Sequence, residues 1–328
     1  MLKRVAVFTG GLIRAEDKHL NILKAAAPDT EICIVKDVDE LRQWSDNVDA
    51  VFTLPHDLQR LAEYCRTAKD FRWLQLLTAG CDALTGTDFM NMEKVLITST
   101  HGIHADPIGD HVIAFIFAFL RGLLTAFENK ASHRFYPPDM TVTGTLDEQK
   151  GKTVGIVSCG SIGLGIAEKL SRMGFRILGY SRHLKNAPFF SAFYTPGHLE
   201  EMLAECDFVV VTSPLTDETY HLFSTDQFNS MKKNAVFINV GRGPVCDSDA
   251  LISALDSHRI AGAALDVTDP EPLPPDSRLW EMKNVIITWH CAAISGYLTD
   301  RAIAKIAENI ALYNSGKEIP YIFKKPDA

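Results

Sequence analysis

The chain has 328 residues, of which 46% are hydrophobic and 23% charged, and its formal net charge is -8. This length exceeds what one ordinary hydrophobic core organises, so two domains are expected. The negative charge argues against nucleic acid or an anionic membrane as the main partner, and no apolar run reaches the roughly 18–20 residues of a membrane span.

Short β-rich runs alternate with helical patterns from the N-terminus onward. The opening MLKRVAVFTGG has too short an apolar run for a signal peptide and predicts a first strand. Strands are expected at RVAVFT (4–9), EICIV (31–35), DAVFTL (49–54), RWLQLL (72–77) and KVLITS (94–99). Alternation of this kind predicts a parallel sheet with crossover helices. A long, mostly apolar helix is expected at 108–124.

A second series of runs begins at residue 153 and predicts a doubly wound domain of about six strands. Its strands are expected at TVGIV (153–157), RILGY (176–180), FVVVTS (208–213), AVFINV (235–240), GAALDV (262–267) and NVIITW (284–289). The polar segment 127–152 contains a Pro-Pro pair and predicts an exposed arm or linker. The last helical pattern, LTDRAIAKIAENIALYNSG, has no sheet of its own and is expected to cross back onto the N-terminal domain.

The seven cysteines are scattered along the chain and never occur in a C-x-x-C spacing. Thiols used in this way predict a reducing compartment, here the cytoplasm. The spacing also predicts that the chain has no zinc site.

The stretch VGIVSCGSIG (154–163) approaches the G-x-G-x-x-G turn of dinucleotide sites, with Ser158 in place of the first glycine. In such a turn Gly160 would let the backbone approach a pyrophosphate, and Gly163 would let the helix pack on the strand. The helix N-terminus offers N–H groups and a positive dipole to the phosphates. Because a strand precedes the turn and a helix follows it, a cofactor site is favoured over a plain strand-to-helix turn.

The second strand of this domain ends in Gly-Tyr-Ser181-Arg182. An NAD site normally has Asp or Glu here to bind the ribose hydroxyls. Arg182, His183 and Lys185 cluster instead, and a guanidinium would clamp the 2′-phosphate that a carboxylate repels. The turn therefore favours NADP(H) as the cofactor, with NAD(H) possible. The alternative is that these residues form a solvated basic turn with no role in cofactor binding.

Three polar residues follow later strands of this domain: Arg242, Glu271 and His290. Ligands of open parallel sheets lie beyond the carboxyl ends of the strands, so the three side chains are expected to converge. Arginine can hold the carboxylate of a 2-oxo acid. Histidine can protonate the alkoxide that develops as hydride arrives, while the glutamate orients the imidazole.

These stretches, together with LDEQKGKTVGIV and VTSPLTDETYHLF, resemble the D-isomer-specific 2-hydroxyacid dehydrogenases over nearly the whole chain. DVTDPEPLP, LRQW and the serine-arginine turn are most similar to the glyoxylate/hydroxypyruvate reductase branch. The resemblance implies an α/β fold with two doubly wound parallel-sheet domains, a Rossmann cofactor domain and a flavodoxin-like substrate domain, with a cleft between them. It implies a substrate domain at 1–103, a cofactor domain at 104–293, and a C-terminal helix segment, 294–328, that returns to the substrate domain. Hinge closure and a homodimer formed through the cofactor domain are implied as well.

The resemblance also implies roles for single residues. Arg242 would bind the substrate carboxylate together with the backbone of Ala79 and Gly80, while His290 would be the acid/base and Glu271 its partner. The positions implied to contact the cofactor are Gly160, Ser161, Ile162, Gly163, Ser181, Arg182, Lys185, Pro214, Val240, Asp266, His290 and Ala292.

The expected function is the NADP(H)-preferring reduction of a small 2-oxo acid to a D-2-hydroxy acid. Glyoxylate, hydroxypyruvate, pyruvate and larger apolar 2-oxo acids are all candidate substrates. Formate dehydrogenase activity is disfavoured because those relatives are expected to carry glutamine where Glu271 stands. The alternative is a nicotinamide-sensing binding protein that resembles the C-terminal-binding corepressors. Cys81 and Cys291 flank the expected active site and predict sensitivity to alkylation, and Trp289 stands where proline is common.

Overall fold

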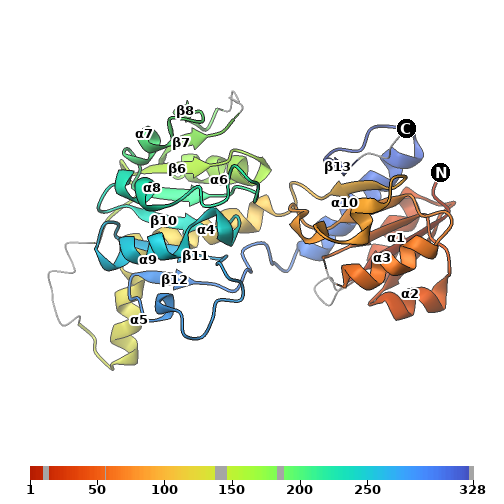
Figure 1. The fold of residues 1–328 in the computed structure, drawn as a ribbon, viewed down its shortest axis with the longest axis horizontal. Coiled ribbons are helices and arrows are strands. Elements are labelled where there is room, and N and C mark those ends of the chain that lie inside the picture. Colours follow the sequence, from red (N-terminus) through yellow and green to blue (C-terminus); the bar gives the residue numbers. More distant parts are fainter. Residues whose placement is uncertain (10–14, 56, 137–145, 183–187, 325–328) are drawn as a thin grey trace. The chain divides into compact units, whose positions relative to one another are not determined.

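The computed structural model describes residues 1–9, 15–55, 57–136, 146–182 and 188–324, and the chain divides into two compact units. Unit 1 comprises Met1–His104 and Ser295–Ala328, and unit 2 comprises Ala105–Ile294. Each unit contains its own sheet with helices packed against it (Figure 1). Each sheet also has two separate clusters of buried apolar side chains. The predicted α/β class with two doubly wound sheets is confirmed.

The sheet of unit 1 has the strand order β13-β5-β4-β3-β1-β2. Its strands are β1 (Arg4–Phe8), β2 (Glu31–Val35), β3 (Ala50–Thr53), β4 (Trp73–Leu76), β5 (Leu96–Ser99) and β13 (Ile322–Lys324). The first five pair in parallel in the order 2-1-3-4-5, which is the flavodoxin-like arrangement. β13 pairs antiparallel with β5 and was not predicted, because three residues are too few for a strand pattern.

The helices of unit 1 include the last long helix of the chain. They are α1 (Asp17–Ala26), α2 (Val38–Trp44), α3 (Leu58–Thr67) and α10 (Leu298–Asn314), with the short 3-10 helices η1 (Asp82–Leu84) and η2 (Asp88–Asn91). The buried Asn309 of α10 donates from Nδ2 to Gln75 Oε1 on β4 at 2.8 Å. His19 of α1 contacts Asp300 of α10, with Nε2 and Oδ1 2.7 Å apart. Residues near both ends of the chain therefore share one core.

The sheet of unit 2 has the order β12-β11-β10-β9-β6-β7-β8, and all its pairs are parallel. Its strands are β6 (Thr153–Val157), β7 (Arg176–Tyr180), β8 (Ala192–Tyr194), β9 (Phe208–Val211), β10 (Val236–Asn239), β11 (Gly262–Leu265) and β12 (Val285–Ile287). This is the Rossmann order 3-2-1-4-5-6 with one further strand. The expected number of about six strands is corrected to seven, because the three-residue β8 gave no pattern in the sequence.

The helices of unit 2 correct one prediction. They are α4 (Ala105–Leu120), α5 (Leu123–Ala131), α6 (Ser161–Arg172), α7 (Leu199–Leu203), α8 (Thr225–Ser230) and α9 (Ser248–Asp256), with 3-10 helices η4 (Gly243–Val245) and η5 (Arg278–Trp280). The single helix expected at 108–124 is instead two helices that meet at 71°. The chain turns at Gly122, whose φ of 61° lies in the left-handed region that glycine adopts without strain.

No single described helix is long and apolar enough to cross a membrane. The bent pair α4–α5 meets the criterion by length and composition alone. Several side chains of α4 are buried in the core of unit 2, among them Val112, Phe115 and Ile116. The segment predicted as an exposed arm or linker begins with part of α5, a helix that has no buried residue.

Candidate active site

The three predicted catalytic residues lie on three loops at one edge of unit 2. Arg242 follows β10, Glu271 follows β11 and His290 follows β12, and these strands are neighbours in the sheet. Because the strands are parallel, their carboxyl ends meet at the same edge. This is the edge at which ligands bind in open α/β sheets.

His290 and Glu271 form a direct contact. Nδ1 of the histidine and Oε1 of the glutamate are 2.6 Å apart, and both side chains are about half exposed. Pro270 and Pro272 restrict φ on either side of the glutamate, which limits the conformations of its loop. With Nδ1–H donated to the carboxylate, Nε2 is the ring atom that faces a reacting group.

The backbone at His290 is held in an unusual conformation by Asp266. The φ of His290 is 55°, and its N–H donates to the Asp266 carbonyl at 2.9 Å. The buried Asp266 carboxylate accepts hydrogen bonds from the next two N–H groups, of Cys291 at 2.9 Å and Ala292 at 3.0 Å. Thr288 Oγ1 donates to the same carboxylate at 2.6 Å. A left-handed non-glycine residue costs about 1–3 kcal/mol, and this set of bonds offsets that strain.

The Arg242 loop packs against the loop that carries Glu271. A Cβ atom on Gly243 would lie 1.9 Å from the carbonyl oxygen of Thr268, so only glycine fits between the two backbones. Asn239 Nδ2 donates to the carbonyl oxygen of Arg242 at 3.0 Å. The half-buried guanidinium donates from Nη1 to the Gly241 carbonyl at 2.8 Å. Backbone contacts therefore help to hold this loop and its cation at the sheet edge.

The turn after β6 has the conformation expected for a glycine although its residue is Ser158. The φ of Ser158 is 78°. Its N–H donates to the Tyr180 carbonyl at 2.9 Å, and its own carbonyl accepts from Thr212 Oγ1 at 2.6 Å. A Cβ on Gly163 would lie 2.5 Å from the same Ser158 oxygen, which explains the requirement for glycine at that position. The turn keeps the dinucleotide-site geometry at the expense of strain in the serine.

Replacing Ser158 by glycine is therefore expected to stabilise the protein by about 0.5–1 kcal/mol, because glycine populates positive φ without steric strain. Chemical denaturation of the full chain, followed by circular dichroism, measures the change. Gly163→Ala is the control of opposite sign, since its new methyl group must displace the Ser158 backbone. A Ser158→Gly variant that is less stable than wild type would show that the serine is not strained.

The N-terminus of α6 fits the phosphates of a dinucleotide. Gly160 is its N-cap, no side chain caps it, and no acidic residue lies in the first turn, which begins with Ser161 and Ile162. A Cβ on Gly160 would meet no described atom within 4 Å. The helix starts beside the junction of β6 and β9, where the strand order reverses. Ligands of doubly wound folds bind at this switch point, and phosphates bind at such helix ends.

The predicted 2′-phosphate residues follow β7. Ser181 is half-buried and donates its N–H to the Tyr194 carbonyl at 3.0 Å. Arg182 is exposed, with Nη1 3.9 Å from Oε1 of Glu218. A pair of exposed charges at this distance is weak, so the guanidinium can exchange Glu218 for another anion. His183 and Lys185 lie outside the described residues.

Four further predicted positions lie on loops that follow parallel strands. Pro214 is exposed after β9, and Val240 is buried directly after β10. In unit 1, Ala79 and Gly80 are half-buried on the loop that follows β4, where Thr78 Oγ1 donates to the Gly80 carbonyl at 2.8 Å. Each of the four therefore lies at the carboxyl edge of the sheet of its own unit.

Two histidines near these loops were missed by sequence reasoning. In unit 1, His104 donates from Nε2 to the carbonyl of Leu77 at 3.2 Å, and burial lowers the pKa of His104. In unit 2, Nε2 of His111 lies 3.1 Å from Thr288 Oγ1. Burial lowers the pKa of His111 as well, and the Asp266 carboxylate acts in the opposite direction. Neither histidine belongs to a local motif, so only the folded chain places them beside these loops.

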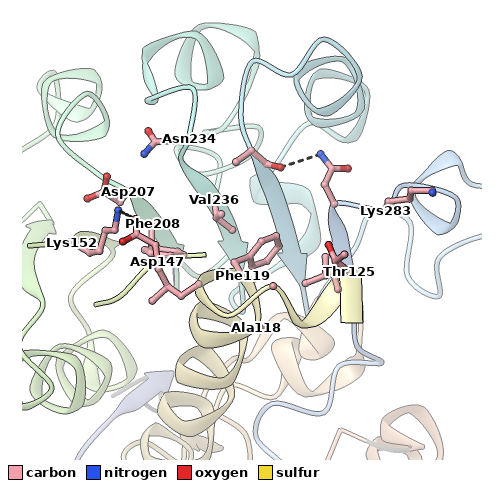
Figure 2. A pocket seen from close by; sticks show the side chains of 15 residues that line it. Ala118, Phe119, Thr125, Asp147, Lys152, Asp207, Phe208, Asn234, Val236 and Lys283 are labelled. Carbon is pink, nitrogen blue, oxygen red and sulfur yellow. Dashed lines mark hydrogen bonds and ion pairs between the residues drawn. The ribbon is translucent and has the colours of Figure 1, made fainter. Parts of the chain in front are cut away.

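One cavity of unit 2 lies at the opposite edge of the sheet. Its volume is about 530 Å³, and Lys152, Asp207 and Val236 line it at the amino ends of β6, β9 and β10 (Figure 2). Phe119 at the end of α4 and Thr125 in α5 also point into this cavity. Because ligands of open parallel sheets bind at the carboxyl edge, this cavity is separate from the predicted active site.

Comparison with known proteins places the chain among dehydrogenases. The family described as D-isomer specific 2-hydroxyacid dehydrogenase, NAD binding domain, matches residues 113–292. A glyoxylate reductase of Korarchaeum cryptofilum is 32% identical over 318 residues, covering 94% of this chain and 91% of that protein.

Solved structures agree with the sequence match. A D-isomer specific 2-hydroxyacid dehydrogenase of Xanthobacter autotrophicus, in complex with NADPH and MES, has a TM-score of 0.80 at 27% identity, covering 99% of this chain and 98% of that one. An NADPH-dependent glyoxylate/hydroxypyruvate reductase of Sinorhizobium meliloti, in complex with NADP and sulfate, has a TM-score of 0.80 at 25% identity, covering 98% of both chains.

Proposed function

The chain belongs to the D-isomer specific 2-hydroxyacid dehydrogenase family and is an NAD(P)-dependent oxidoreductase, and from this premise we propose that it reduces a small 2-oxo acid to the D-2-hydroxy acid with NADPH as the preferred cofactor. The observation that carries the proposal is the contact of 2.6 Å between His290 and Glu271. This pair lies in the same unit and at the same sheet edge as the glycine turn.

Each residue of the site has a separate task in this reaction. A nicotinamide cofactor, when bound, would supply the hydride for C2 of the substrate. Arg242 binds the substrate carboxylate through two charge-assisted hydrogen bonds and so fixes the orientation of the carbonyl. The protonated His290 donates from Nε2 to the carbonyl oxygen as negative charge develops there. Glu271 stabilises the imidazolium before the transfer and holds the ring in place.

The binding of the cofactor is assigned to residues of unit 2. The N–H groups of Ser161 and Ile162, with the glycines at 160 and 163, would hold the pyrophosphate at the N-terminus of α6. Asp266, Ala292, Val240 and Pro214 would line the nicotinamide end. At the nicotinamide, Asp266 would accept a hydrogen bond from the carboxamide.

The preference for NADPH is assigned to the turn after β7. Ser181 stands where a carboxylate would repel a 2′-phosphate, and Arg182 is exposed beside it. Two structures similar to this chain hold NADPH or NADP, which supports the same preference here.

Arg182→Ala is therefore expected to weaken NADPH binding by about 10- to 100-fold, the equivalent of one charge-assisted hydrogen bond or two, and to leave NADH binding near wild type. Fluorescence titration of both reduced cofactors measures the two dissociation constants. The control is Arg172→Ala, which removes an exposed arginine from the opposite end of α6. Equal losses for NADPH and NADH in Arg182→Ala would contradict the phosphate clamp.

The reaction itself is tested by initial rates of NADPH and NADH oxidation with glyoxylate, hydroxypyruvate, pyruvate, 2-oxoisocaproate and phenylpyruvate. We expect fast turnover with NADPH on one or two of these acids, and formation of the D-isomer where the product is chiral. Tight cofactor binding without turnover on any of them would overturn the enzymatic assignment and favour a cofactor-sensing protein.

We also propose that the chain forms a homodimer through unit 2. Helix α5 has no buried residue, and it exposes Leu123 and Phe127, which are 42% and 69% accessible. An apolar helix face of this kind is commonly covered by a partner. Static light scattering on the full chain is expected to give twice the mass of one chain.

A further inference from the structure

Three side chains that can act as metal ligands, an imidazole, a carboxylate and a thiol, lie close together beside the His290 loop. A ring nitrogen of His111, a carboxylate oxygen of Asp266 and the Sγ of Cys291 all lie within 4.8 Å of one another. They come from α4, from the end of β11 and from the loop after β12. The prediction of no zinc site rests on the absence of a C-x-x-C spacing, and this cluster contains a single cysteine.

The combination of ligands favours zinc. Imidazole nitrogen, thiolate sulfur and carboxylate oxygen bind Zn²⁺ at about 2.0–2.3 Å, so tetrahedral ligand atoms lie about 3.3–3.8 Å apart. His111 Nε2 and Asp266 Oδ1 are already 3.7 Å apart. Magnesium and calcium prefer sites made of oxygen ligands alone. Three protein ligands with water as the fourth would complete the coordination.

The groups around the cluster orient its ligands in the way that metal sites require. Thr288 Oγ1 and the N–H group of Cys291 donate to Oδ1 of Asp266, the N–H group of Ala292 donates to Oδ2, and the Cys291 thiol is hydrogen-bonded to the same carboxylate. Loss of the thiol proton on metal binding would release the carboxylate lone pair that accepts this hydrogen bond, and that lone pair can then bind the cation. The ring of His111 packs edge-on against Phe115, with centroids 4.4 Å apart. Hydrogen-bonded ligands of this kind raise metal affinity.

Access to the cluster is open from one side. The Asp266 side chain is 2% exposed, whereas that of His111 is 21% exposed. Cys291 and Cys33 are the two half-buried thiols of the chain, and the other five cysteines are buried. A cation can therefore reach the thiol and the imidazole from solvent and then bind the buried carboxylate.

We propose that this cluster binds Zn²⁺ and that the bound ion inhibits the enzyme. On binding, the Cys291 thiol loses its proton to solvent, and the Nε2 of His111 coordinates the ion with its ring proton on Nδ1. The inhibitory part rests on the proposed function, in which Asp266 and Ala292 line the nicotinamide end of the cofactor. An ion held by Asp266 occupies the lone pair that the carboxamide would use, so Zn²⁺ and NADPH are expected to compete.

Metal binding is tested on the cofactor-free full chain by calorimetric titration with ZnCl₂ and by absorption spectroscopy with Co²⁺. We expect one Zn²⁺ per chain and a thiolate-to-cobalt charge-transfer band. Cys291→Ser and His111→Asn are each expected to weaken Zn²⁺ by at least about tenfold, and Cys291→Ser is expected to abolish the band. Cys33→Ser, which changes the other half-buried thiol, is the control and should behave as wild type.

The absence of a charge-transfer band in the wild type, or its persistence in Cys291→Ser, would overturn the site. Thermal unfolding of each variant establishes that it is folded, and the two single substitutions alter different elements. If either folded variant retains wild-type affinity for Zn²⁺, the ion binds elsewhere and the proposal fails.

Competition is measured by repeating the Zn²⁺ titration at increasing NADPH. An apparent Zn²⁺ dissociation constant that rises with NADPH supports the inhibitory role. An unchanged constant overturns that role. NADPH binding is also measured without metal, which tests the proposed function separately. A failure of the zinc proposal can therefore be distinguished from a failure of the proposed function.

Discussion

Replacing His290 by alanine is expected to lower kcat by about 10²- to 10⁴-fold, the usual contribution of a general acid, while the dissociation constant for NADPH stays near the wild-type value. In the proposed reaction the imidazole delivers the proton, and its contact of 2.6 Å with Glu271 would orient it for this step. Stopped-flow or steady-state rates with the best 2-oxo acid, together with fluorescence titration of NADPH, measure both quantities.

Glu271→Gln is the matched control for this experiment. It keeps the size of the side chain and a hydrogen bond to Nδ1 but removes the charge that stabilises the imidazolium. We expect a smaller loss of kcat than in His290→Ala. Near-normal turnover in His290→Ala would remove the histidine from the catalytic assignment.

Replacing Arg242 by alanine is expected to lower kcat/KM for the 2-oxo acid by about 10²- to 10³-fold, because two charge-assisted hydrogen bonds to the carboxylate are lost. Much of this loss should appear in KM, which distinguishes it from the loss in His290→Ala. NADPH binding should be unchanged.

Arg242→Lys tests whether geometry as well as charge is needed at this position. A lysine restores the positive charge but not the planar fork that matches a carboxylate, so partial recovery is expected. A variant Arg242→Ala with wild-type KM for the acid would show that another cation binds the substrate. In either variant, a loss of NADPH affinity would place the arginine at the cofactor instead.

The sequence predicted those parts of the fold that have local patterns. Eleven strands were expected, and each corresponds to a strand of the structure with ends shifted by at most two residues. These strands are apolar runs bounded by turn residues, which periodicity detects. The strands β8 and β13 have three residues each and form only by pairing with a neighbouring strand. No local sequence pattern therefore predicts them.

The break between α4 and α5 was missed for a different reason. Apolar residues continue across Gly122, and glycine alone does not end a helix with certainty. The bend depends on the positive φ of this residue, which is a property of the folded chain.

In the candidate site, too, residues in local motifs were predicted, whereas contacts between residues far apart in sequence were not. Arg242, Glu271 and His290 were predicted because each follows a strand, and strand ends share one edge. The partners of Asp266 were not predicted, because His111 and Asp266 are far apart in sequence and meet only after α4 packs against the sheet.

The contact at Gly243 couples two loops of the site, so that neither loop can change its backbone independently of the other. The backbone of the Arg242 loop rests directly on that of Thr268 in the Glu271 loop, with no room for a side chain between them. Transfer of either loop alone from a relative would join surfaces that did not evolve together. An altered substrate range is therefore more readily engineered by exchanging residues 240–274 as one block, with Gly243 retained, than by exchanging the loops one at a time.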